Sequence, residues 1–157
     1  MNRPANEFEQ IIIEEAFKIA DDRKRYEYIY ISLCDYMDKI FSENNICDFK
    51  EDKCIRQREG KAPHETMGCC YTFEYSKFTR FPKDTGLCKY INENKCSVKN
   101  LTCKMFTCKY LKEKGYNYLI RKNPVIKLCF NKKQVKYLEE AFFKSMEEVI
   151  NRLLELS

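Results

Sequence analysis

The distribution of cysteines constrains this chain more than any other feature. Eight of its ten cysteines lie between Cys47 and Cys108, and six of them fall in the forty residues that begin at Cys69. Thiols at this density in a chain without an export signal have two common uses, metal binding and redox chemistry. The middle of the chain is therefore expected to bind metal and to be ordered by coordination bonds rather than by apolar burial.

The N-terminal part of the chain, residues 1–45, predicts helix. Its apolar side chains recur at steps of three and four, which places them on one helical face. The pair Asp21 and Asp22 is suited to cap a second helix within this part. Both a helical hairpin and one bent helix fit the pattern.

The C-terminal residues 131–156 predict a single helix. Asn131 is suited to cap it together with Gln134, and its apolar residues form a stripe close to a heptad repeat. Such a stripe packs most simply on the other helices of the same chain. A homodimer through this C-terminal helix is the alternative.

Residues 46–115 form the cysteine-rich metal-binding segment. Glycines and prolines mark turns along it and its apolar residues keep no sustained period, so we expect loops and one or two short helices. We see no internal repeat. At 157 residues the chain suits a single domain, 1–157. The predicted fold class is mainly α, with N- and C-terminal amphipathic helices packed around an irregular cysteine-rich metal-binding middle segment.

Charge is distributed unevenly along the chain. The formal net charge is +5, but residues 1–52 carry 7 basic and 13 acidic residues, whereas residues 95–136 carry 12 basic residues and one acidic residue, Glu113. Attraction between acidic helices and the basic stretch accounts for this pattern within one molecule. Nucleic-acid binding through the basic stretch 95–136 is the alternative, with lysines on phosphates and tyrosines as stacking side chains.

The sequence shows neither an apolar export signal at its N-terminus nor an apolar run long enough to span a membrane. We therefore expect a cytosolic protein that does not enter the membrane and whose thiols stay reduced. An exported protein with five disulfides is the alternative.

The candidate metal ligands are the cysteines of the middle segment. They include no Cys-x-x-Cys pair, the spacing that is typical of zinc fingers and of thioredoxin-like redox centres. His64, the only histidine, is a further candidate for zinc. In the order in which the sequence favours them, the cysteines are Cys69, Cys70, Cys88, Cys96, Cys103, Cys108, Cys54 and Cys47.

Cys103 and Cys108 cannot bind one metal from the middle of one regular helix, because a spacing of five residues places their side chains about 140° apart. We expect an irregular backbone or a helix start at this point, followed by a short helix that Gly115 ends as its C-cap. Cys34 and Cys129 belong to patterned apolar segments. We expect these two to pack as small hydrophobic residues and not to bind metal.

Part of the segment resembles a known family. Two stretches carry the resemblance: Leu87-Cys88-Lys89-Tyr90-Ile91-Asn92-Glu93-Asn94-Lys95-Cys96-Ser97-Val98-Lys99 and Cys103-Lys104-Met105-Phe106-Thr107-Cys108. Together they are similar to the cysteine pattern of the YkgJ-like cysteine-cluster family. Gly68-Cys69-Cys70 resembles the end of that family's first cysteine signature. The resemblance covers about residues 66–110 and stops upstream, where a long polar insert follows Cys54. It implies a bound zinc ion or iron–sulfur cluster, and a related domain occurs in flagellin lysine methylases.

The leading hypothesis is a small cytosolic metal-binding protein whose cysteine cluster holds structural zinc and whose helices present an interaction surface to a protein partner. The alternative cofactor is an iron–sulfur cluster, which would serve electron transfer or protein modification. The sequence contains no nucleotide-binding glycine loop, no hydrolase triad and no zinc-protease helix. It therefore does not predict an enzyme.

Overall fold

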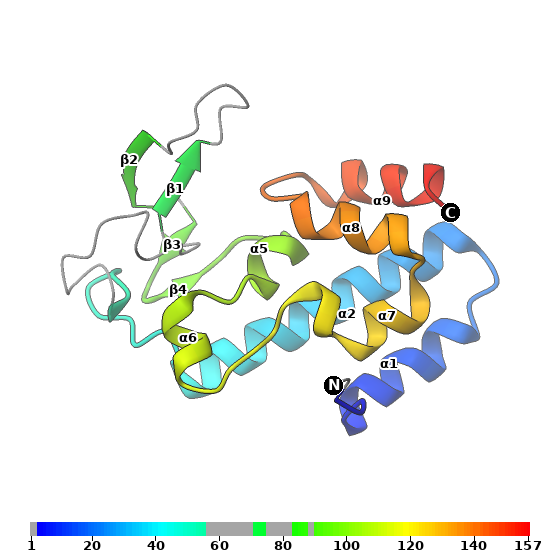
Figure 1. The fold of residues 1–157 in the computed structure, drawn as a ribbon, viewed down its shortest axis with the longest axis horizontal. Coiled ribbons are helices and arrows are strands. Elements are labelled where there is room, and N and C mark those ends of the chain that lie inside the picture. Colours follow the sequence, from blue (N-terminus) through cyan, green and yellow to red (C-terminus); the bar gives the residue numbers. More distant parts are fainter. Residues whose placement is uncertain (1–2, 56–70, 75–82, 88–89) are drawn as a thin grey trace. The chain divides into compact units, whose positions relative to one another are not determined.

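A computed structural model of the chain describes residues 3–55, 71–74, 83–87 and 90–157. The fold is mainly helical, which confirms the predicted class. The chain divides into two compact units, each of which is described by itself (Figure 1). Unit 1 consists of Met1–Lys39, Lys99–Met105 and Tyr118–Ser157, and unit 2 of Ile40–Val98 and Phe106–Asn117. Within the described part of the chain, every helix is too short or too polar to cross a membrane.

The first 45 residues form two helices rather than one bent helix. Lys18 closes the first helix, and the Oδ1 atom of Asp21 accepts a hydrogen bond from the backbone N–H of Lys24 at 2.8 Å. Asp21 therefore caps the second helix, as the sequence predicts. The Arg25 side chain donates to the Ile19 carbonyl at 3.1 Å and fixes the link. The helices of unit 1 are α1 (Glu7–Phe17), α2 (Asp22–Asn44, with its last residues in unit 2), α5 (Leu101–Met105), η1 (Ile120–Lys122), α7 (Pro124–Cys129), α8 (Lys132–Glu140) and α9 (Met146–Glu155).

The prediction of one helix over 131–156 is wrong, because the chain breaks between α8 and α9 (Figure 1). Asn131 and Gln134 form the expected capping box at the start of α8. A second capping box, formed by Ser145 and Glu148, starts α9 afresh. Phe143, in the connection, has a φ of 60°, which no helix accommodates.

Short α5 lies at the centre of unit 1, and all five of its side chains are buried. It contacts α8, which also contacts η1 and α9, while α1 packs on α7. The Thr102 hydroxyl donates to the Leu138 carbonyl at 2.5 Å, and the Leu101 N–H donates to the Tyr30 hydroxyl at 3.0 Å. These bonds satisfy the first N–H of the helix and a buried hydroxyl within the core.

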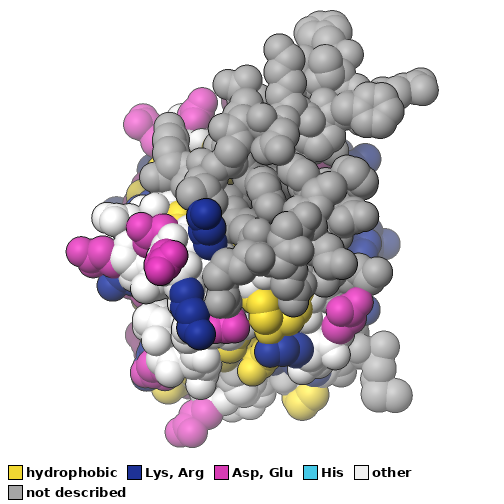
Figure 2. Space-filling model, turned by 90° about the vertical axis from the view of Figure 1, so that its left-hand side faces the viewer, with side chains coloured by type: hydrophobic (Ala, Val, Ile, Leu, Met, Phe, Trp, Pro, Cys, Tyr) yellow, Lys and Arg dark blue, Asp and Glu magenta, His cyan; other side chains and the backbone are white. Residues whose placement is uncertain are grey.

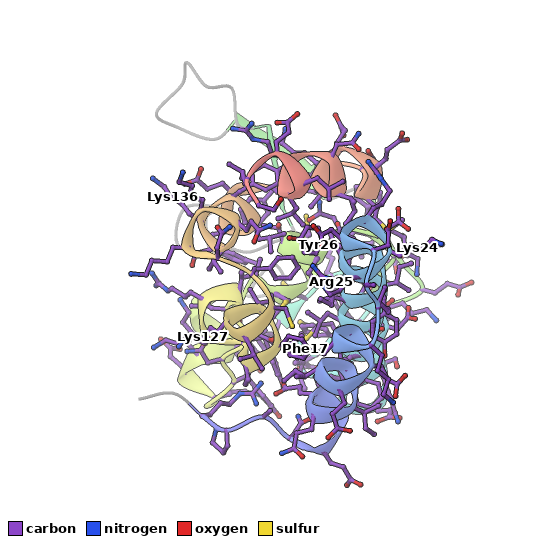
Figure 3. The ribbon with its side chains drawn as sticks, turned by 90° about the vertical axis from the view of Figure 1, so that its right-hand side faces the viewer. Phe17, Lys24, Arg25, Tyr26, Lys127 and Lys136 are labelled. Atoms are coloured by element: carbon purple, nitrogen blue, oxygen red, sulfur yellow. The ribbon has the colours of Figure 1, made fainter. Side chains whose placement is uncertain are left out.

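A second buried polar contact joins α2, α8 and α9. Gln134 is 2% exposed, and its amide nitrogen donates to the Tyr26 hydroxyl at 3.0 Å and to the Leu153 carbonyl at 2.8 Å. Figure 3 shows Tyr26 reaching from α2 into the interior with Arg25 beside it, whereas Lys127 and Lys136 extend outward. Tyr26 also packs on Phe130, with ring centroids 5.1 Å apart.

Unit 2 contains the described strands, which the sequence did not predict. Two short antiparallel hairpins, β1 with β2 and β3 with β4, accompany one short helix, α6. Their bounds are β1 (Tyr71–Glu74), β2 (Lys83–Leu87), β3 (Ile91–Asn92), β4 (Lys95–Cys96) and α6 (Lys109–Glu113). Few described residues of this unit are buried and apolar, so apolar burial among them is small compared with that of unit 1.

Candidate metal centre

The predicted ligands fall into three groups. Four of them lie in unit 2 and are described: Cys47, Cys54, Cys96 and Cys108. Cys103 lies in unit 1, within α5. The others lie outside the described residues, namely Cys69, Cys70, Cys88 and His64.

Cys54 follows a tight turn. Lys50 and Lys53 pair as an antiparallel bridge, and each donates its N–H to the carbonyl of the other at 3.0 Å. The two residues between them, Glu51 and Asp52, have φ angles of 51° and 59°. Two successive positive φ angles are typical of a type I′ turn, the turn whose twist matches a β-hairpin.

Cys96 follows a turn of the same form. Asn92 pairs with Lys95 across β3 and β4, and the intervening Glu93 and Asn94 have φ angles of 49° and 60°. Both turns therefore consist of two left-handed residues, followed by a lysine and then a cysteine. We call residues 49–54 the first cysteine hairpin and residues 91–96 the second.

The two hairpins are joined through equivalent residues. The backbone N–H of Asp52 donates to the side-chain Oδ1 of Asn94 at 2.9 Å, and the N–H of Asn94 donates to Oδ1 of Asp52 at 2.9 Å. Each of these residues is the second left-handed residue of its turn. We call this pair of hydrogen bonds the clasp. Because the bonding is reciprocal, Asp52 and Asn94 make equivalent contacts with each other.

The equivalence of the two turns reveals a repeat that our sequence analysis missed. The first hairpin reads Phe-Lys-Glu-Asp-Lys-Cys and the second Ile-Asn-Glu-Asn-Lys-Cys. The shared pattern is an apolar residue, any residue, Glu, Asp or Asn, Lys and Cys. A search for short repeats around each cysteine would have found it, whereas a search for repeats of 20 residues or more would not.

Two thiols, those of Cys47 and Cys54, lie among the apolar residues of these hairpins. Phe49 and the buried Cys54 form a small cluster, against which Cys47 and Ile91 pack. Ile91 is the cross-strand partner of Cys96. Cross-strand partners project to the same face of a hairpin, so the half-buried Cys96 shares the face of Ile91. The arrangement thus directs cysteines from both hairpins to one region of unit 2.

The described residues do not complete a metal site. They contain no group of three or more His, Cys, Asp or Glu side chains that is arranged to hold a metal ion. Tetrahedral zinc takes four ligands, so a centre at the cysteine hairpins needs donors beyond this part of the chain. The sequence supplies further candidate donors, Cys70 and Cys88, which lie outside the described residues. Tyr71 and Leu87 are register partners of β1 and β2, and they directly follow Cys70 and directly precede Cys88 in the sequence.

Cys108 has the position that its spacing from Cys103 predicts. The backbone between α5 and α6 is irregular, and Cys108 is the N-cap residue of α6. The helix ends at Gly115, whose φ is +89°. The N–H of Gly115 donates to the Lys112 carbonyl at 3.0 Å and that of Tyr116 to the Leu111 carbonyl at 2.9 Å, the two bonds of a Schellman motif.

Cys103 and Cys34 lie in the core of unit 1. Cys103 is 4% exposed, and its backbone N–H donates to the Asn100 side chain at 2.8 Å. Cys34 is 5% exposed on α2, and burial raises its pKa to about 12. Burial in the core leaves this thiol protonated at neutral pH. Cys34 is thus buried as the sequence predicts, whereas Cys129 is half-buried, and burial raises the pKa of its thiol too.

The basic residues of 95–136 are divided between the two units. Lys104 is 5% exposed and pairs with Asp38 inside unit 1, and Phe130 is part of the core, so neither is available to a nucleic acid. In unit 2 the Lys114 ammonium lies over the Tyr110 ring, 4.6 Å from its centroid. Figure 2 shows acidic and basic side chains interspersed among the described residues of one face. This face presents no broad basic field of described side chains, which electrostatic binding of nucleic acid requires.

No protein-family model, no curated protein and no solved structure matches the chain. The resemblance to the YkgJ-like cysteine-cluster family consequently stays a prediction from the sequence.

Proposed function

We propose that the protein binds zinc through thiolates of unit 2, and that the metal is structural. One observation carries the proposal: two equivalent hairpins, joined by the clasp, direct Cys54 and Cys96 to the same region of the unit. Cys47 packs in the same cluster. Thiolates are the preferred ligands of structural zinc.

The remaining ligands in this proposal come from Cys69, Cys70, Cys88 and Cys108. We leave Cys103 out of the set, because its side chain is buried in the helical core of unit 1. A bound zinc would supply unit 2 with stability that its described apolar residues do not supply, since structural zinc contributes roughly 10 kcal/mol to small domains. Thiolate ligands also require a reducing environment, so we propose that the protein acts in the cytosol.

Unit 1 would then present the interaction surface to a protein partner. Its helices expose several large apolar side chains, among them Phe17 on α1, at 63%, and Leu128 on α7, at 59%. These two helices pack on each other. Figure 3 shows Phe17 at the end of α1, in the region where α7 lies.

Elemental analysis of protein purified under reducing, anaerobic conditions tests the zinc proposal. We expect about one zinc per chain or more, no visible colour, and an intense thiolate-to-metal charge-transfer band after cobalt substitution. Cys54→Ser and Cys96→Ser should lower the metal content, whereas Cys129→Ser, in unit 1, should not. If the protein is brown and bleaches on reduction, the bound cofactor is an iron–sulfur cluster and not zinc. Protein without metal and with all thiols reduced would refute the proposal.

A further inference from the structure

The clasp has a feature that a simple turn contact would not have. It joins the second left-handed residue of one turn to the same residue of the other, although the two residues are 42 positions apart in the sequence. Each side chain accepts the backbone N–H of the other residue, and each bond measures 2.9 Å. The two hairpins are therefore held in one fixed relation to each other.

Cys54 and Cys96 have equivalent positions relative to the clasp. Each follows its clasp residue by two positions, so the two cysteines occupy equivalent positions in the two hairpins. Their cross-hairpin neighbours are also equivalent, because Phe49 and Ile91 occupy matching positions and pack in one cluster. If the clasp opened, each hairpin would keep its own turn. The position of one cysteine relative to the other would no longer be fixed.

We infer that Asp52 and Asn94 are positioning residues of the metal centre: they hold the two cysteine hairpins so that Cys54 and Cys96 bind one metal ion. This inference rests on the proposed function. A metal site whose cysteines are already in position binds metal more tightly, because less conformational entropy is lost when the metal binds. Opening the clasp should therefore weaken metal binding without removing a ligand.

Glycine variants test the bonds without adding strain. Asp52 and Asn94 have φ angles of 59° and 60°, which glycine adopts readily, so Asp52→Gly and Asn94→Gly delete an acceptor and keep the turn. Each variant should raise the dissociation constant for zinc about fivefold, the equivalent of one net hydrogen bond. Glu93→Gly is the matched control, because it puts glycine at the neighbouring left-handed position, outside the clasp. It should change the constant less than about twofold.

Exchange of the aspartate and the asparagine between positions 52 and 94 provides the decisive variant. Asn94→Asp alone places two carboxylates in the clasp and should weaken binding by at least as much as glycine does, because like charges repel at this distance. The double variant Asp52→Asn/Asn94→Asp restores one carboxylate and one amide, with the same net charge and the same two acceptors. Its zinc affinity should return to within about twofold of the unmodified protein, a rescue that a general loss of stability would not show.

The experiment is a competition titration of the full-length protein with a chromophoric zinc chelator, with far-ultraviolet circular dichroism as a check that the helices of unit 1 are unchanged. Unmodified protein that binds no zinc would overturn both the proposed function and this inference. Unmodified protein that binds zinc, together with glycine variants of equal affinity or an exchange that gives no rescue, would overturn the positioning role alone.

Discussion

The buried Lys104–Asp38 ion pair makes an asymmetric prediction about the stability of unit 1. The side chain of Lys104 is 3% exposed, whereas that of Asp38 is 37% exposed and also lies 3.6 Å from Lys99. Removal of Asp38 leaves a buried ammonium without its carboxylate. Removal of Lys104 leaves a carboxylate that water and Lys99 still reach. The two partners are thus not equivalent, although they share one bond.

The burial of the two side chains determines how much each substitution should change the free energy of unfolding. Breaking a fully buried pair by removing one partner costs about 3–5 kcal/mol. Because Asp38 is more than a third exposed, water relieves part of this cost, and we expect Asp38→Asn to lower the free energy of unfolding by about 2 kcal/mol. Lys104→Met keeps the apolar stem and removes the charge, so we expect a change within about 1 kcal/mol of zero.

Urea unfolding followed by circular dichroism at 222 nm measures both changes, provided that the m-values agree. The double variant Asp38→Asn/Lys104→Met should recover most of the loss caused by Asp38→Asn, because no buried charge then remains. Lys99→Met, at a lysine that is 79% exposed, is the control and should change stability by less than about 0.5 kcal/mol. The reasoning is refuted if Lys104→Met costs as much as Asp38→Asn, or if the two losses add in the double variant.

Three further outcomes follow from other contacts. Burial raises the pKa of Cys34 from 9.0 to about 12, so the folded protein keeps a proton that the unfolded chain releases. The free energy of unfolding should therefore fall between pH 9 and 12. Cys34→Ala should make this fall with pH less steep when urea unfolding is measured at alkaline pH. Gly115→Ala should cost about 1 kcal/mol in a thermal unfolding experiment, because φ is +89° while the added Cβ meets no atom within 4 Å. Gln134→Leu should cost about 2 kcal/mol in urea unfolding, because the buried Leu153 carbonyl and the Tyr26 hydroxyl lose their donor.

Local signals in the sequence were sufficient for the starts of α2 and α8. Asp21 and Asn131 cap helices as predicted, because an N-cap depends on residues within one turn of it. The break before α9 was missed although Ser145 and Glu148 form an ordinary capping box. The apolar stripe continues across the break and concealed it. The apolar periodicity indicated one continuous helix, whereas the capping residues indicated a new helix start, and the structure follows the capping residues.

The hairpins of unit 2 were harder to predict. Their turns contain no glycine, and Glu51 and Glu93 occupy left-handed conformations that glutamate seldom adopts. The contact between Asp52 and Asn94 spans 42 residues, so no local pattern reveals it. For the same reason the sequence predicted eight candidate cysteines but did not separate Cys103, in unit 1, from the cysteines of unit 2.

The path of the chain through unit 1 has a consequence for folding. Lys99–Met105 belongs to unit 1, although Ile40–Val98 and Phe106–Asn117 on either side belong to unit 2. Contact of α5 with α2 therefore closes a loop of roughly sixty residues, whereas its contact with α8 closes a shorter one. Loop closure costs an entropy that grows as about 1.5 RT times the logarithm of the loop length.

If unit 2 folds first, that loop is already short. Reducing its effective length from about sixty residues to about ten would lower the closure cost by about 1.5 kcal/mol. If unit 2 binds metal as we propose, metal binding would thus accelerate the folding of unit 1 through chain connectivity alone. On that proposal, newly made protein without bound metal would spend longer with the apolar face of α2 exposed than metal-bound protein would. It would also be more open to proteolysis.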